Sequence, residues 1–111
     1  MPAARYDLII DQGSDFEISI AIEEDGSAMN LTNYGARASM RSRVESETDH
    51  DFVATITGST VKIQMTYSTT AALTAGSYVY DVEIFTPSTG TETSVTRILQ
   101  GRATVTPEVT R

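Results

Sequence analysis

The chain has 111 residues, which suits one domain and leaves little room for both a core and a deep cleft. Its 8 basic and 15 acidic residues give a formal net charge of -7, which disfavours duplex nucleic acid and anionic membranes as partners. The absence of cysteine excludes disulfides and thiol chemistry, and no apolar run reaches the roughly 20 residues of a membrane span. No apolar stretch of a secretory signal follows residues 1–5, so synthesis in the cytoplasm without export is expected.

The first half of the chain alternates with the period of two that is typical of strands with one buried face. A strand is predicted over residues 6–10, followed by a turn around Gly13. The clearest alternation covers residues 16–22, where the apolar side chains all share one parity. The dipeptide at 25–26 is Asp-Gly, which predicts a hairpin to a short strand over residues 28–31.

A turn at Asn33-Tyr34-Gly35 leads into a predicted strand over residues 36–42, in which small side chains face inward. Residues 44–51 are acidic and polar and are interpreted as an exposed loop. A hairpin then joins strands over residues 52–56 and 61–66. The next stretch, 68–73, is consistent with one helical turn capped by Ser68 or Thr69.

The last two predicted strands cover residues 78–85 and 93–105. Gly101 predicts a bulge in the longer one, because glycine removes a side chain and permits unusual backbone geometry. The helical turn that ends before Gly76 places Tyr78 where an immunoglobulin-like domain has its tyrosine corner, although a simple core position explains Tyr78 equally well.

About seven strands with turns every 8–12 residues predict an all-β, immunoglobulin-like antiparallel β-sandwich. Residues 1–111 are expected to form this single domain, with polar segments at both ends. We expect residues 1–5 and 106–111 to act as tethers that become ordered on assembly, with Pro107, Val109 and Arg111 among the contact residues.

Three segments resemble stretches of small virion proteins of tailed bacteriophages. They are NLTNYGARASMR at 30–41, LTAGSYVYDVE at 73–83 and RILQGRATVTPEVTR at 97–111. The chain also resembles the immunoglobulin-like N-terminal domain of phage baseplate upper proteins. The resemblance implies an immunoglobulin-like sandwich in the virion, without enzymatic activity or cofactor. Because the sequence carries no receptor-binding module after these segments, it implies an adaptor or a decoration protein.

Few residues offer catalytic or metal chemistry. His50 is the only histidine, and its acidic neighbours match no calcium-binding loop, so a solvated loop is the favoured interpretation. Asp11 and Asp15 flank Gly13, where turn formation explains them better than catalysis. The Asn-Leu-Thr triplet at 30–32 fits a glycosylation pattern but is explained by a strand end.

Candidate interaction residues lie on the polar parity of two predicted strands. Arg37, Arg41 and Arg43 either form cross-strand ion pairs, which is the favoured reading, or bind an acidic partner surface. Val79 and Phe85 lie opposite the predicted core parity, which indicates exposed apolar side chains. These side chains either form a contact patch or are the single exposed apolar residues that are normal on protein surfaces.

The sequence therefore favours a non-enzymatic virion protein of the tail or baseplate that helps to attach tail fibres. Its partners would be other virion proteins, contacted by many copies in a symmetric assembly, through exposed sheet edges for example. A capsid decoration protein of the same fold is one alternative. A carbohydrate-binding module is another, which the absence of Trp disfavours; Tyr6, Tyr34 and Tyr67 are the aromatic residues left for it.

Overall fold

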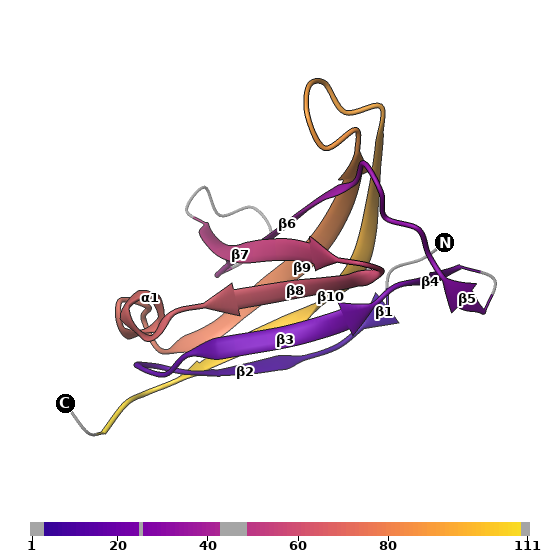
Figure 1. Cartoon of the computed structure of the whole chain (residues 1–111). Helices are drawn as coiled ribbons and strands as arrows, with labels where there is room; N and C mark the ends of the chain where they lie inside the picture. Colours follow the sequence, from indigo (N-terminus) through magenta and orange to yellow (C-terminus); the bar gives the residue numbers. More distant parts are fainter. Residues whose placement is uncertain (1–3, 25, 43–48, 110–111) are drawn as a thin grey trace.

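The computed structural model describes residues 4–24, 26–42 and 49–109, and strands dominate this part of the chain (Figure 1). The strands are β1 (Ala4–Arg5), β2 (Leu8–Asp11), β3 (Phe16–Ala21), β4 (Glu23–Glu24), β5 (Ser27–Ala28), β6 (Gly35–Arg41), β7 (His50–Thr57), β8 (Thr60–Met65), β9 (Gly76–Thr86) and β10 (Ser94–Thr106). One short helix, α1 (Tyr67–Ala71), precedes β9. Seven of the described strands have four or more residues, so the predicted all-β class and strand number are confirmed.

The strands form two layers that are joined by β7. In the first layer β9 lies between β10 and β6, and both pairings are antiparallel. The start of β7 pairs with β6 as far as Phe52, whereas from Val53 onward β7 pairs with β8, and β8 pairs with β3. Figure 1 accordingly shows β7, β8 and β3 lying across β9 and β10. The chain is therefore an immunoglobulin-like β-sandwich, made by one sheet that curls over itself.

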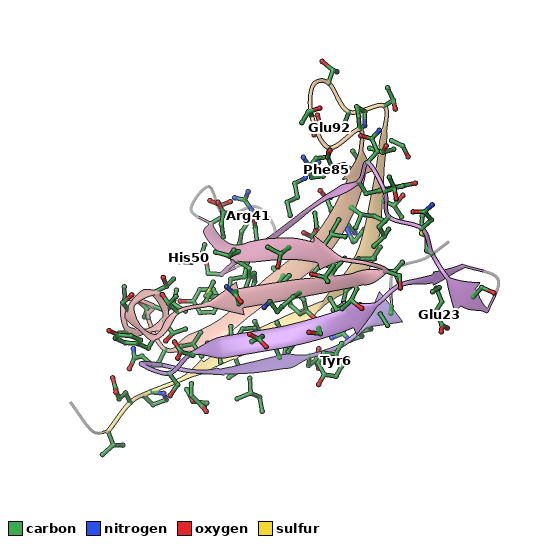
Figure 2. The ribbon with its side chains drawn as sticks, viewed as in Figure 1. Tyr6, Glu23, Arg41, His50, Phe85 and Glu92 are labelled. Atoms are coloured by element: carbon green, nitrogen blue, oxygen red, sulfur yellow. The ribbon has the colours of Figure 1, made fainter. Side chains whose placement is uncertain are left out.

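The first strands depart from the antiparallel prediction, because β1 and β2 both pair in parallel with β10. Parallel pairing is available here because nearly the whole domain connects these strands. The strand predicted over 6–10 begins only at Leu8, because Tyr6 and Asp7 lie between β1 and β2. There the backbone N–H of Arg102 donates to the Asp7 carboxylate over 3.0 Å, and the Tyr6 ring is exposed beside β2 (Figure 2).

Alternate side chains of each layer fill the space between the layers. On β9 the inward residues Tyr80, Val82 and Ile84 are 4%, 0% and 2% exposed, as the alternation predicts. The buried apolar set consists of Leu8, Ile10, Ile22, Leu31, Ala38, Met40, Phe52, Val61, Ile63, Met65, Leu73, Tyr78, Tyr80, Val82, Ile84, Leu99, Ala103 and Val105.

The clearest alternation in the sequence belongs to a strand that the core covers only in part. Phe16, Ile18 and Ile20 on β3 are half-buried and pack against the core from its side. The reason is tertiary: among the described residues β3 pairs with β8 alone, so it is an edge strand.

The predicted bulge at Gly101 is wrong. The pairing of β10 with β9 shifts between Arg97 and Leu99, whereas Gly101 pairs regularly with Tyr80. Position 101 instead has no room for a side chain, because a Cβ there would lie 2.3 Å from the backbone oxygen of Tyr6. The same oxygen accepts a hydrogen bond from the Tyr80 hydroxyl, so glycine allows β1 and β2 to approach β10 closely.

The tyrosine corner is confirmed, because the Tyr78 hydroxyl donates to the backbone oxygen of Thr74 over 2.6 Å. The helical turn before it exists but begins earlier than predicted, with Thr66 rather than Ser68 or Thr69 at the N-cap. The cap shifts because Asp15 accepts a hydrogen bond of 2.7 Å from the backbone N–H of Tyr67 and thereby holds the first turn.

The β2–β3 turn is fixed by the residues that the sequence assigns to turn formation. Gly13 has a φ of 84°, and its N–H donates to the hydroxyl of Thr70, which is fully buried. The Thr70 hydroxyl in turn donates to the backbone oxygen of Ser14. Asp11 accepts a hydrogen bond of 2.7 Å from the Thr106 hydroxyl, so its carboxylate has a structural partner.

Candidate functional site: the arginine face

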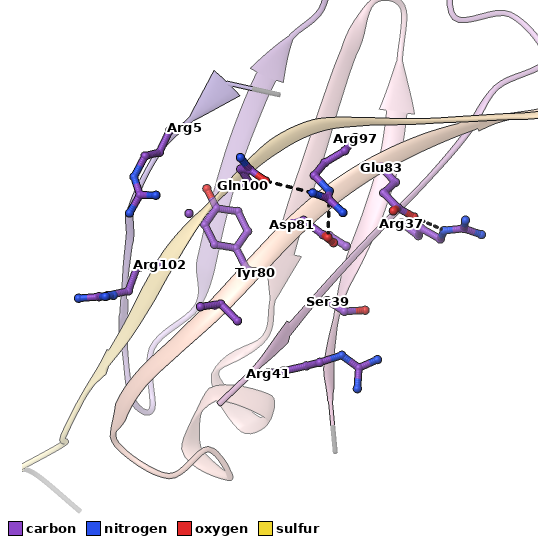
Figure 3. A pocket seen from close by; sticks show the side chains of 13 residues that line it. Arg5, Arg37, Ser39, Arg41, Tyr80, Asp81, Glu83, Arg97, Gln100 and Arg102 are labelled. Atoms are coloured by element: carbon purple, nitrogen blue, oxygen red, sulfur yellow. Dashed lines mark hydrogen bonds and ion pairs between the residues drawn. The ribbon is translucent and has the colours of Figure 1, made fainter. Parts of the chain in front are cut away.

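The outer surface of the first layer gathers most of the basic residues. Arg37 and Arg41 of β6, Arg97 and Arg102 of β10, and Arg5 of β1 line an open hollow of about 660 Å³ (Figure 3). We call these five residues the arginine face. The other basic residue in the described part of the chain, Lys62, lies on β8 in the second layer. Although the chain has a net charge of -7, five of the six basic residues that the structure describes lie on one side of the sandwich.

Strand register places the outward side chains of β10, β9 and β6 in three parallel rows. Each row contains one residue from each strand, because residues paired across a sheet point to the same face. The rows are Arg102–Val79–Arg41, Gln100–Asp81–Ser39 and Arg97–Glu83–Arg37. We call the first of them the Val79 row.

In the row centred on Glu83, Arg37 has two acidic partners. Arg37 Nε donates to Glu83 over 2.9 Å, and Arg37 Nη1 donates to Glu92 over 2.7 Å. These hydrogen bonds, first that to Glu83, raise the pKa of Arg37, and the hydrogen bond from Arg37 lowers the pKa of Glu92. The predicted cross-strand ion pair is therefore confirmed for Arg37.

Phe85 is less exposed than its parity predicts. Its ring is half-buried at the β9–β10 hairpin end of the sandwich, and the Arg37 guanidinium lies 4.8 Å from the ring centre. A Cβ on Gly35 would lie 2.5 Å from the ring, so Gly35 makes the space that Phe85 fills. Figure 2 shows Phe85 and Glu92 at this end. The prediction of an exposed Phe85 is wrong, because the ring fits the space left by Gly35 and lies under the Arg37 guanidinium group.

The middle row holds a partly buried carboxylate. Arg97 Nε lies 3.3 Å from Asp81, and Arg97 also donates to the side chain of Gln100 (Figure 3). Burial, followed by the nearby charge of Glu83, raises the pKa of Asp81. Ser39 donates to Asp51 over 2.7 Å, so this row too has its polar groups paired.

The Val79 row contains two arginines and no carboxylate. Arg41 forms an ion pair of 3.6 Å with Asp49, which lies just before β7 rather than on a neighbouring strand. No ion pair to the Arg102 side chain occurs within the described residues, and this side chain is exposed. Val79 is half-buried between the two arginines rather than fully exposed as predicted.

The remaining predicted contact residues do not line this hollow. Pro107 and Val109 are exposed beyond β10, with Val109 92% accessible. Between them the backbone N–H of Glu108 donates to the side chain of Gln12 over 2.9 Å. Arg43 and Arg111 lie outside the described residues, so their contact role stays a prediction.

The candidate metal-binding and sugar-binding residues lie elsewhere and have structural roles or no shared site. His50 begins β7 and packs edge to face against Tyr78, with ring centres 5.8 Å apart. Across residues 4–24, 26–42 and 49–109, no group of three His, Cys, Asp or Glu side chains could hold a metal ion. Tyr6, between β1 and β2, and Tyr67, at the start of α1, are exposed, whereas Tyr34 packs against the core.

Sequence reasoning finds the β6 arginines and Val79 but misses Arg5, Arg97 and Arg102. The missing signal is register. The bulge between Arg97 and Leu99 determines which β10 residues share the face of β6, and no local alternation marks that position.

The fold defines the chain as a small immunoglobulin-like sandwich with one basic outer surface. It belongs to the family of LtfC-like, beta-sandwich domains, whose family model matches residues 2–106. No curated protein matches the chain. Within the described residues, no helix has the length and apolar character that crossing a membrane requires.

Two solved structures resemble the chain. The M1 domain from titin shares 12% identity over 97% of this chain and 94% of that chain, with a TM-score of 0.39. The Listeria monocytogenes internalin-like protein lmo2027 shares 17% identity over 94% of this chain, with a TM-score of 0.43, and the chain spans 28% of its length. Similarity at this level carries no information about function.

Proposed function

We propose that the chain is a non-enzymatic structural protein of a bacteriophage virion, located in the tail or baseplate, where it helps to attach tail fibres. Membership of the LtfC-like family carries this proposal, because LtfC is related to phage tail fibres. The resemblance of three segments to tailed-phage virion proteins supports it independently of the fold.

The free edge of β3 offers a docking mode for such a protein. In the described chain β3 has a partner on one side only, so alternate backbone N–H and C=O groups face outward. The half-buried side chains of Phe16, Ile18 and Ile20 lie along the same edge. A partner strand added there would gain main-chain hydrogen bonds and cover these apolar groups.

The chain ends supply a second docking mode, in a shorter form than the sequence predicts. Ala4 and Arg5 pair with β10 and Thr106 pairs with Asp11, so these residues belong to the sandwich. The C-terminal tether therefore begins at Pro107, and Val109 is its most exposed described residue.

Deleting the gene from a phage that encodes the chain tests the proposed function. Mass spectrometry of purified wild-type virions is expected to detect the chain, and deletion particles are expected to lose tail-fibre proteins and host adsorption. Expression of the chain from a plasmid should restore both. Wild-type virions without the chain would contradict the proposal, as would deletion particles that keep a full set of fibres.

The same deletion particles distinguish the tail assignment from the capsid alternative. Deletion particles with normal fibres but heads that rupture more readily would overturn the tail assignment and favour a capsid decoration protein. The exposed tyrosines do not favour the carbohydrate-binding alternative, because Tyr6 lies between β1 and β2 whereas Tyr67 begins α1, so no strand or helix presents both.

A further inference from the structure

The free edge of β3 presents a defined set of backbone groups. The N–H of Ile22 donates to the backbone oxygen of Ser59 over 2.9 Å, and this pair continues the register of β3 with β8 by one residue. Because hydrogen-bonded and non-hydrogen-bonded pairs alternate in an antiparallel ladder, every second residue back from Ile22 directs its N–H and C=O toward β8. Glu17, Ser19 and Ala21 direct theirs to the other side, where no strand of the described chain pairs with β3 (Figure 1).

This edge lacks the features that usually keep sheet edges apart. β3 has six residues, contains neither proline nor lysine, and pairs with β8 without a bulge. By contrast, β2 in the first layer has only four residues and is separated from β1 by Tyr6 and Asp7. The charged side chain of β3 is that of Glu17, which is exposed and lies 3.8 Å from Lys62. β3 can therefore pair with another extended strand.

We propose that β3 pairs in an antiparallel manner with β3 of a second copy of the chain, around a twofold axis at Ser19. In this register Glu17 of each copy lies opposite Ala21 of the other, and the two Ser19 residues lie opposite each other. Each of these pairs gains two main-chain hydrogen bonds, so all the outward backbone groups of β3 find partners. The proposal rests on the docking mode of the proposed function and names the partner that the β3 edge accepts.

The side chains of β3 favour a second copy over an unrelated strand. A twofold axis requires the strand to be complementary to itself, because the same residues supply both sides of the contact. On the core side, Ile18 of each copy lies opposite Ile20 of the other, so these half-buried side chains cover each other. On the outer side, the carboxylate of Glu17 faces alanine, so no like charges are opposed. A strand from another protein requires no such match.

The two neighbouring registers fit less well. An axis at Glu17 would place the two Glu17 carboxylates opposite each other, which is unfavourable. An axis at Ile18 would place Ala21 opposite Asp15, which precedes β3 and accepts the hydrogen bond from the N–H of Tyr67. The axis at Ser19 therefore makes the fullest use of the strand.

Sedimentation equilibrium of the full chain tests the proposal. The measurement covers concentrations up to about 1 mM in about 0.5 M salt, because salt screens the repulsion between copies that each have a net charge of -7. We expect the measured mass to rise from that of one chain toward that of two. A Kd of about 0.1 mM is expected, since pairing through one edge buries less than the roughly 1,200 Å² of stable interfaces.

Charged variants locate the axis. Ser19→Glu and Ser19→Lys should each weaken the dimer about fivefold, because like charges then meet at the axis, and a mixture of the two should associate more tightly than either alone. Thr55→Glu is the matched control. Thr55 on β7 and Ser19 on β3 both pair with Lys62 of β8, from opposite sides, and both are exposed. Thr55→Glu therefore adds the same charge beside the same lysine, away from the β3 edge, and should leave the dimer unchanged.

Hydrogen exchange in the unmodified protein gives a second measurement that does not depend on how a variant folds. The amides of Glu17, Ser19 and Ala21 should exchange more slowly as the protein concentration rises, because pairing protects them. The amides of Ile18 and Ile20 are directed toward β8 and should be protected equally at low and high concentration.

Three results would overturn the proposal. The mass of one chain at every concentration would exclude the second copy and assign the β3 edge to a strand of another protein. Equal losses in Ser19→Glu and Thr55→Glu would place the contact on a different surface. A tighter dimer of Ser19→Lys alone would place residue 19 opposite Glu17 and contradict the register. None of these results concerns location in the virion, so the proposed function and this proposal can fail separately.

Discussion

Replacement of Gly101 by alanine tests how the arginine face is built, because this glycine lets β1, which carries Arg5, lie against β10. A Cβ at this position would lie 2.3 Å from the Tyr6 oxygen and 2.9 Å from the Asp7 carboxylate. Backbone cannot yield as a flexible side chain does, so the β1–β2 segment must move away from β10.

The expected loss in free energy of unfolding follows from the packing and the hydrogen bonds that this movement disturbs. Overpacking costs about 1–3 kcal/mol. Weakening of the hydrogen bonds from the Tyr80 hydroxyl to Tyr6 and from the Arg102 N–H to Asp7 adds about 0.5–1.5 kcal/mol each. We expect the free energy of unfolding to fall by about 3 kcal/mol, a large part of the total for a small domain. At a urea dependence of about 2 kcal/mol per M, the midpoint should fall by about 1.5 M.

Urea denaturation followed by circular dichroism measures the change, with Gly58→Ala as the matched control. Gly58 has a φ of 62° and no atom within 4 Å of a Cβ, so its replacement reports backbone strain alone, about 1 kcal/mol. In the double variant Gly101→Ala with Tyr80→Phe, the loss in free energy of unfolding should be smaller than the sum of the two single losses, because both substitutions act on the hydrogen bond to Tyr6. A loss no greater than that of Gly58→Ala would refute the reasoning.

Three further predictions concern single interactions. Tyr78→Phe removes the hydrogen bond to Thr74 and should lower the free energy of unfolding by about 1 kcal/mol, measured by urea denaturation; an unchanged midpoint would mean that the tyrosine corner contributes nothing. Burial raises the pKa of Tyr80 to about 12 from the ordinary value of 10.0, so between these pH values the unfolded chain releases a proton that the folded chain keeps. Stability should therefore be fully present below pH 10 and fall by up to about 2–3 kcal/mol as the pH rises to 12, and denaturation at alkaline pH should show a smaller fall in Tyr80→Phe. Arg37→Ala uncovers Phe85 and should cost about 1 kcal/mol at low salt and less at high salt; a loss independent of salt would contradict its ionic part.

Local alternation predicts those parts of the fold in which each residue's environment follows from its own strand. The predicted strand over 78–85 lies within β9, with Tyr80, Val82 and Ile84 inward, and the helical turn before it correctly places Tyr78 at the corner. These features depend on neighbours a few residues away, so the sequence pattern contains them.

Local alternation does not predict features that depend on partners distant in the sequence. The parity of Phe85 is right, yet its exposure depends on Gly35 and Arg37, which reach it only through the pairing of β6 with β9. The half-burial of Ile18 follows from the edge position of β3, which is a property of the whole sheet. Arg102 joins the face of Arg41 only because a bulge sets the register of β10.

The location of the chain in the virion tests the account most directly. Purified phage particles that carry the chain can be incubated with an antibody raised against it and then with a gold-labelled secondary antibody, and inspected by electron microscopy. The account predicts gold at the tail or baseplate, next to the points where fibres emerge. Gold confined to the heads, or none on particles that are permeable to the antibody, would contradict it.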